Sequence, residues 1–370
     1  MKTISLKKYI AAGITLGGLL FQTSLRADTE VFFVGGNASQ NVLYDRVTNI
    51  LTGGISKVVI SPTNATVRTY VGTITSQPGL GNVTIDFSLL GAVGGFQDLA
   101  NQVNEPTALT NTTITPTVAV SSTAPEAVGI DPTPFTQTRT LVVPFVFIKN
   151  TNKSPALISL TNLTQQQAYY LEGAAGTLPT TFFGGTSSSP LYLVARNTSA
   201  AVRTEVDANI YFSGTISTWT TNSQTVYGSL GVPYSTTANG LPVPDPGLGQ
   251  SSGSNVRALL GVITNAIGTV AAQDISTLTP IAYNGVPFSI TNVETGVYPI
   301  WSYERWAYKK TGQTGTPTTP QLTVINALLS AVTNATFQST GTVFVGNFAR
   351  LANLQVDRSS DGGPITSTIY

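Results

Sequence analysis

The sequence predicts an α/β fold. Short apolar runs end at Gly, Ser or Asn residues, and helix-period patterns follow several of these runs. One near-continuous apolar run, Leu141 to Ile148, suits a strand that is buried on both faces. The 370 residues are enough for one large domain or two ordinary domains with real cores.

The first half of the chain alternates between strand and helix patterns. The expected strands are residues 31–34, 57–60, 67–71, 83–90, 118–120 and 141–148. After the first strand and its Gly/Asn/Ser loop, apolar residues between Val42 and Leu51 share one helical face, and Gly53-Gly54 ends that helix. Phe96, Leu99 and Val103 indicate a second, shorter helix.

The second half repeats this alternation. The expected helices are residues 163–171, 202–210, 254–263 and 319–332, and the expected strand is 191–195. Ser254 is the expected cap of the third helix, and Thr319-Pro320 supplies an N-cap and an N1 proline for the last. Residues 220–253, rich in Ser, Thr, Gly and Pro, indicate a long surface insertion.

Composition excludes several kinds of chemistry. The chain has no His and no Cys, so it has no Ser-His-Asp triad, imidazole ligand, disulfide, zinc ribbon or lipoprotein cysteine. Gly249 to Gly253 fits a G-x-S-x-G nucleophile pattern, but prolines precede it where a strand is required, and the His partner is missing. We expect a Gly/Ser loop there, and a protein that is not an enzyme and needs no metal or cofactor.

The first 27 residues have the pattern of a cleaved signal peptide. Lys2, Lys7 and Lys8 precede an uncharged apolar run, Tyr9 to Leu20, and a cut after Ala27 fits. A membrane anchor is the alternative, although the run is short for a span of about 20 residues. Cleavage leaves 14 basic against 17 acidic residues, a net charge of −3. We therefore expect a periplasmic or secreted chain that binds no nucleic acid and does not span a membrane.

Hydroxyl- and Gly-rich loops follow three of the expected strands, at residues 35–39, 121–123 and 196–199. Ligands of open α/β sheets bind beyond the carboxyl ends of the strands, where helix N-termini offer free N–H groups. Arg196 adds a guanidinium suited to an oxyanion. The alternative is ordinary helix capping by Ser39, Thr198 and Ser199, with Arg196 paired to an acid.

Several stretches, in order, resemble the phosphate-binding-protein-like family of ABC-transporter substrate-binding proteins, the type 2 periplasmic binding proteins. The matching stretches are Phe33 to Ser39, Tyr70 to Thr73, Val118 to Pro125, Leu141 to Asn150, Leu160 to Thr164, Val194 to Arg203, Asn265 to Gly268 and Tyr298 to Trp301. Val194 to Arg203 matches the spacing of the family's "Arg-Asp-x-x-Ser-Gly-Thr-Arg" phosphate loop.

The chain departs from the family at two points. Ala200-Ala201-Val202 stands where the phosphate loop has Ser-Gly-Thr, which removes two hydroxyl donors. Ser121-Ser122 stands where the family often has an Asp that accepts a proton from bound phosphate. Each lost neutral donor weakens binding by about 0.5–1.5 kcal/mol. The cleft is then expected to hold phosphate weakly, to prefer another oxyanion, or to be vestigial.

The resemblance implies a two-lobed fold with a ligand cleft between the lobes. Lobe one is expected at residues 28–143 plus 284–370 and lobe two at 144–283. The ligand-binding residues that it implies are Gly36, Asn37, Ala38, Ser39, Thr73, Ser121, Ser122, Arg196, Thr198 and Ser199. The expected function is capture of a small oxyanion, phosphate or phosphate-like, for an ABC permease, by a monomer. The alternative is a structural or surface-interaction protein that keeps this fold without binding a solute.

Overall fold

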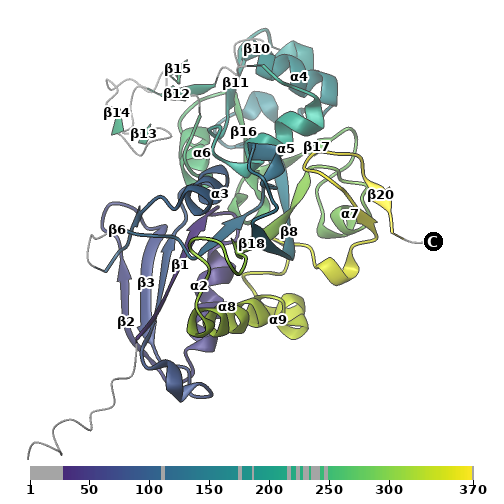
Figure 1. The fold of residues 1–370 in the computed structure, drawn as a ribbon. Coiled ribbons are helices and arrows are strands. Elements are labelled where there is room, and N and C mark those ends of the chain that lie inside the picture. The colour runs from purple at the N-terminus through teal and green to yellow at the C-terminus, as the bar shows by residue number, and fades with distance from the viewer. Residues whose placement is uncertain are drawn as a thin grey trace, which may run out of the picture.

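The structure is a computed structural model that describes residues 28–109, 113–173, 177–185, 187–214, 218–221, 226–227, 233–234, 242–245 and 249–368. Within them, one mixed sheet of 12 strands runs through the molecule in the order β10-β11-β16-β8-β18-β7-β1-β4-β3-β2, with β17 also paired to β8 and β9 paired to β17. Helices cover both of its faces (Figure 1). The predicted signal segment, 1–27, and most of the predicted insertion at 220–253 lie outside the described residues.

The strands of the large sheet are β1 (Thr29–Gly35), β2 (Ile55–Ile60), β3 (Val67–Gly72), β4 (Val83–Ser88), β7 (Val118–Ser121), β8 (Phe135–Lys149), β9 (Asn162–Leu163), β10 (Thr177–Pro179), β11 (Pro190–Val194), β16 (Ala266–Ala271), β17 (Thr279–Tyr283) and β18 (Trp301–Lys309). The smaller pairs are β5 (Glu105–Pro106) with β6 (Thr113–Ile114), β12 (Trp219–Thr221) with β15 (Pro242–Pro244), β13 (Val226–Tyr227) with β14 (Pro233–Tyr234), and β19 (Val356–Asp357) with β20 (Thr366–Ser367). The helices are α2 (Gln40–Ile50), α3 (Ala92–Asn101), α4 (Gln165–Gly173), α5 (Ala201–Ile210), α6 (Gly253–Leu260), α7 (Ile290–Glu294), α8 (Thr319–Val332) and α9 (Ala335–Thr340).

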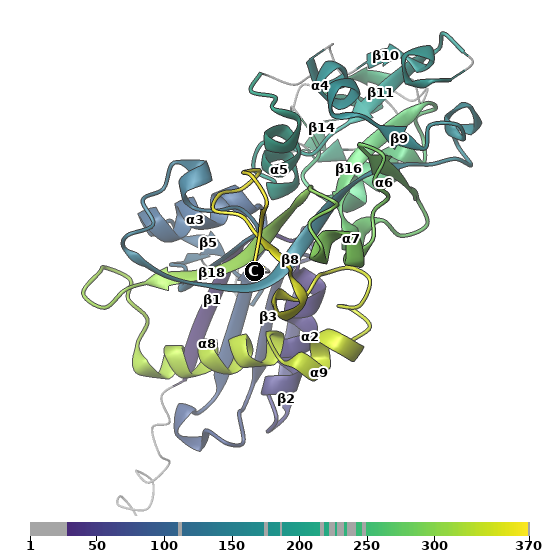
Figure 2. The same ribbon diagram turned by 90° about the vertical axis from the view of Figure 1, so that its right-hand side faces the viewer.

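Strand β8 belongs to both halves of the molecule. Its residues 135–144 pair with β18, and its residues 145–149 pair with β16. The sheet therefore passes from one lobe to the other along a single strand. We call the half with β1–β4, β7 and β18 lobe one and the half with β10, β11 and β16 lobe two; Figure 2 shows lobe one below and lobe two above.

Lobe one packs helices on both faces of a buried sheet. Phe33 on β1 stacks with Phe87 and meets the edge of Trp306, with ring centroids 5.3 Å apart in both pairs. On the other face, Phe96 and Leu99 of α3 pack into a cluster with Ala119 and Phe135. Burial on both faces explains why β1 is apolar in consecutive positions and does not alternate.

Lobe two follows the same plan around β11 and β16, which run parallel. Val256, Leu259 and Leu260 of α6 pack against Val146 and Ile148 of β8. These apolar residues recur at helical spacing, so burial of one face accounts for α6.

The structure confirms the predicted α/β class and moves two predicted caps. Ser252, not Ser254, caps α6: its backbone is extended, and its side chain accepts the N–H of Asn255. Thr318, one residue before the predicted cap, begins α8 with a capping box to Gln321. Among the helices of the described residues, none has the length and hydrophobicity needed to cross a bilayer.

Candidate functional site

Three helices from the two lobes begin around one small cavity. α2 and α3 belong to lobe one and α5 to lobe two. The cavity is lined by Gly36, Asn37, Ala38, Gly91, Ala92, Ser122, Phe145, Arg196, Ala200, Ala201, Val202 and Ala271. This is the interlobe position that the sequence predicts for a ligand.

Close packing of two parallel strands builds the wall in lobe one. β1 and β7 run parallel, so their carboxyl ends reach the same edge of the sheet. Gly35 ends β1 with a φ of +134°, and a Cβ there would lie 1.9 Å from the carbonyl oxygen of Val120. The N–H of Gly36 donates to that carbonyl at 2.8 Å. Only glycine at position 35 allows this approach.

The first turn of α5 forms the wall in lobe two. Its N-cap residue, Ala200, has no side chain that can cap the helix. Among the hydrogen bonds of the described residues, none uses the N–H of Ala201 or Val202. Free N–H groups and the partial positive charge of a helix N-terminus therefore face the cavity, and both favour an anion.

Arg196, just after β11, brings a buried cation to the cavity. Only 4% of the residue is exposed. Its Nε donates to the carbonyl oxygen of Gln250 and its Nη2 to that of Ser251, each at 3.0 Å. Burial lowers the pKa of Arg196 to about 10, and the nearby Asp274 carboxylate partly offsets this. The guanidinium thus stays protonated at neutral pH, and its two recorded bonds are to neutral acceptors.

The other predicted residues after β11 lie at the rim or beneath the surface. Ser199 donates through Oγ to Oδ1 of Asn197 at 2.9 Å, and the buried Nδ2 of Asn197 has no partner within the part of the chain that the structure describes. Thr198 is exposed. Neither Thr198 nor Ser199 lines the cavity or caps α5.

The two serines at the end of β7, Ser121 and Ser122, have different surroundings. Ser121 donates through Oγ to the carbonyl oxygens of Ala92 and Thr123, each at 3.0 Å, so its hydroxyl is occupied within lobe one. The Oγ of Ser122 is buried and has no hydrogen-bond partner among the described residues, and the residue lines the cavity. Of the two predicted serines, Ser122 is the one available to a ligand.

Two other predicted residues do not line the cavity. Ser39 is buried, and its hydroxyl donates to the carboxylate of Glu304 on β18. Thr73 follows β3, which runs antiparallel to β4, so Thr73 is at the opposite end of the sheet, hydrogen-bonded to Gly53 and Gly54. Thr73 is therefore not part of the candidate site.

The lobes touch each other across the cavity. The N–H of Val93 donates to the carbonyl oxygen of Ser199 at 3.1 Å. Gln273 of lobe two donates through Nε2 to the carbonyl oxygen of Asn37 at 2.9 Å. The cavity they enclose has a volume of about 10 Å³, which is room for about one water molecule. The two lobes are therefore in direct contact at this site.

Sequence reasoning missed the partners that fix this site. The carbonyl groups of Gln250 and Ser251 orient Arg196, and Glu304 holds Ser39. The only sequence signal for the first pair was the glycine of the 249–253 loop: Gly249 has a φ of +123° and packs directly against the backbone of Arg196.

No protein-family model matches the sequence, and no curated protein matches it. Among solved structures, a protein described as a phosphate ABC-transporter substrate-binding protein from Clostridium perfringens, with bound phosphate, has a TM-score of 0.56 at 13% identity. The match covers 87% of this chain and 100% of that one. An ABC-type phosphate transport receptor from Vibrio cholerae has a TM-score of 0.49 at 12% identity over 81% of this chain and 93% of its own. PstS from Borrelia burgdorferi has a TM-score of 0.44 at 13% identity, over 87% of this chain and 99% of its own.

At 13% identity, the likeness to the Clostridium perfringens protein shows a shared fold. The chain has the two-lobed fold of the substrate-binding proteins of phosphate ABC transporters. The fold implied by the sequence resemblance is thereby confirmed.

Proposed function

We propose that this chain is an exported solute-binding protein that captures a small oxyanion, phosphate or phosphate-like, between its lobes for delivery to an ABC permease. The observation that carries the proposal is the convergence of three helix N-termini and the buried guanidinium of Arg196 on one interlobe cavity. The partial positive charges of helix N-termini from both lobes meet the full positive charge of Arg196 there. An anion would neutralise these charges.

The donors for the anion come from few groups. Arg196 supplies the charge, Ser122 a free hydroxyl, and Ala201 and Val202 their N–H groups. Of the described residues that line the cavity, none is acidic. Phosphate and sulfate are therefore not discriminated by a carboxylate, and we expect broad oxyanion selectivity.

Binding requires the lobes to separate and close again, because the closed cavity holds about one water molecule. The interlobe bonds from Val93 to Ser199 and from Gln273 to Asn37 would break in opening. We propose lobe boundaries at 28–143 plus 284–370 and 144–283, which put these bonds across the cleft. Export is supported by the signal-peptide pattern of residues 1–27.

The second candidate function is a structural or surface-interaction protein that binds no solute. Two observations favour it: the small size of the closed cavity, and the apolar Ala200-Ala201-Val202 wall where the related loop carries hydroxyl groups.

A thermal-shift screen of residues 28–370 against phosphate, sulfate, nitrate, phosphonates and small carboxylates distinguishes the solute-binding function from the structural function. An anion at 100 times its dissociation constant adds about 2.7 kcal/mol to the free energy of unfolding. We expect a shift with a tetrahedral oxyanion that Arg196→Gln abolishes. Arg68→Gln is the matched control, because Arg68 lies on β3, near the edge of the sheet, and does not line the cavity. A well-folded protein that shifts with none of these anions supports the structural function instead.

A further inference from the structure

The chain ends in a hairpin whose tip lies between the two lobes. β19 and β20 pair antiparallel, Val356 with Ser367 and Asp357 with Thr366. The connecting turn carries Arg358, Asp361 and Gly362. Figure 2 shows this yellow segment rising from lobe one to lie beside α5 of lobe two.

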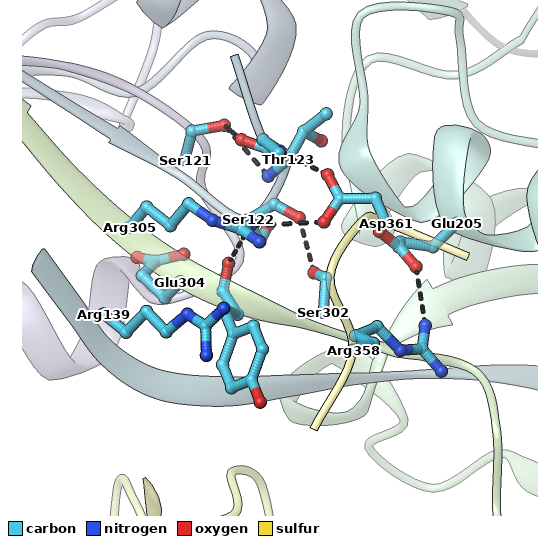
Figure 3. A network of polar contacts seen from close by, with 12 residues as sticks. Ser121, Ser122, Thr123, Arg139, Glu205, Ser302, Glu304, Arg305, Arg358 and Asp361 are labelled. Carbon is cyan, nitrogen blue, oxygen red and sulfur yellow. Dashed lines mark hydrogen bonds and ion pairs between the residues drawn. The ribbon is translucent and has the colours of Figure 1, made fainter. Parts of the chain in front are cut away.

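The hairpin tip contacts lobe two through the middle of α5. Nη1 of Arg358 lies 3.3 Å from Oε2 of Glu205, and both side chains are at most 1% exposed (Figure 3). The N–H of Gly362 donates to the same oxygen at 3.1 Å. Gly362 also packs so closely on α5 that a Cβ there would lie 2.0 Å from the Cβ of Ala208.

The same tip contacts lobe one. Arg358 donates to the carbonyl oxygens of Trp301 and Pro299 at 2.8 and 2.7 Å, and its guanidinium lies 4.1 Å from the centre of a Trp301 ring. Asp361 pairs with Arg305 at 3.2 Å through Oδ1, and its Oδ2 accepts the N–H of Ala124 (Figure 3).

These contacts hold both walls of the candidate site. The first turn of α5 is the lobe-two wall, and Glu205 lies one turn beyond it. Ala124 follows the Ser121-Ser122-Thr123 turn, which contributes Ser122 to the cavity. Opening the lobes with the hairpin left on lobe one would break the contacts of Glu205 with Arg358 and Gly362, and with the hairpin left on lobe two it would break the contacts of Asp361 with Arg305 and Ala124.

We propose that the C-terminal hairpin is a built-in latch that keeps the lobes closed with no solute bound. Its Asp361 carboxylate occupies backbone and guanidinium donors beside the cleft, and its Arg358 guanidinium fixes α5. This inference does not depend on which solute the cleft binds, or on whether it binds one.

The latch proposal is tested by measuring the distance between the lobes, through fluorescence energy transfer, in the absence of any anion. The chain has no cysteine, so Lys57→Cys on lobe one and Lys153→Cys on lobe two, both exposed, give two unique sites for fluorophores. Gly362→Ala drives a methyl group into Ala208. Gly346→Ala is the matched control, because Gly346 has a similar φ of +82° against +62° but open space around its Cβ.

We expect a lower energy-transfer efficiency in Gly362→Ala than in the parent and in Gly346→Ala, with a cooperative melt retained. Asp361→Asn, which keeps the side-chain size and removes the charge facing Arg305, should lower the efficiency as well. Equal efficiencies in the parent and in every folded latch variant would overturn the proposal. A parent protein that binds none of the anions in the thermal-shift screen, while Gly362→Ala still lowers the transfer efficiency, would count against the proposed function and support the latch.

Discussion

The hydroxyl group of Ser39, at the start of α2, donates a hydrogen bond to the buried carboxylate of Glu304 on β18. The second oxygen of that carboxylate has no partner among the described residues. Burial raises the pKa of Glu304 from 4.5 to about 7, while the bond from Ser39 and the charge of Arg305 lower it in part. An acid beside the candidate site therefore changes charge close to neutral pH.

Stability should fall as the pH rises through this range. The folded chain keeps the Glu304 proton up to pH about 7, whereas the unfolded chain releases it near 4.5. Between these values the folded state binds more protons, so the free energy of unfolding decreases with pH by at most about 1.4 kcal/mol per unit for this group. Glu304→Gln removes the change, so its melting temperature relative to the parent should rise from pH 4 to pH 8. The exposed Glu126→Gln is the control; equal pH profiles for parent and Glu304→Gln would contradict the prediction.

Restoring a hydroxyl donor to the cleft should strengthen oxyanion binding. Val202→Thr places a hydroxyl group at the cavity wall with little change of volume. One added hydrogen bond contributes about 0.5–1.5 kcal/mol, which corresponds to roughly a 2- to 13-fold lower dissociation constant for phosphate. Val206→Thr makes the same change one turn further along α5, away from the cavity, and should leave the affinity unchanged. Calorimetric titration measures both; identical affinities for the two variants would place the anion elsewhere.

Removing Arg358 should destabilise the fold strongly. Burial raises the pKa of Glu205 well above its usual value, Asp361 raises it further, and Arg358 offsets them. Arg358→Met leaves a buried carboxyl group without its cation, at a cost of about 3–5 kcal/mol. Adding Glu205→Gln should recover part of this loss, because the two residues form one interaction. Urea denaturation of both single variants and the double variant measures the coupling; additive losses would show that the pair acts independently.

Gly35 should tolerate no side chain. In Gly35→Ala the new Cβ would meet the backbone carbonyl of Val120, which cannot move without breaking the β1–β7 pairing. We expect that Gly35→Ala either does not fold or loses at least about 3 kcal/mol of its free energy of unfolding. Gly54→Ala, also at positive φ but with open space around its Cβ, should lose far less. Thermal melts of both variants decide this, and similar melting temperatures would refute the steric explanation.

Local patterns predicted seven strands of the large sheet, six of the helices and the place of Arg196 after a strand, but they did not predict the strands β16, β17 and β18 or the short helices α7 and α9. They did not give strand direction: residues 67–71 were correctly predicted as a strand, but only the pairing with β4 shows that Thr73 faces away from the cleft. They also gave no sign of the hairpin latch. Arg358 and Glu205 are separated by 153 residues, and nothing in the sequence near either one indicates the other.

The shared strand β8 also determines the order in which the chain can fold. Its first ten residues need β18, residues 301–309, as a neighbour, and β7 needs the opposite edge of β18. Lobe two, by contrast, has all of its strands by residue 283. During synthesis, lobe two can therefore assemble while half of β8 remains unpaired, and lobe one closes only when the last part of the chain arrives. Proteolysis of stalled nascent chains ending before and after β18 should show protection of lobe one only in the longer chains.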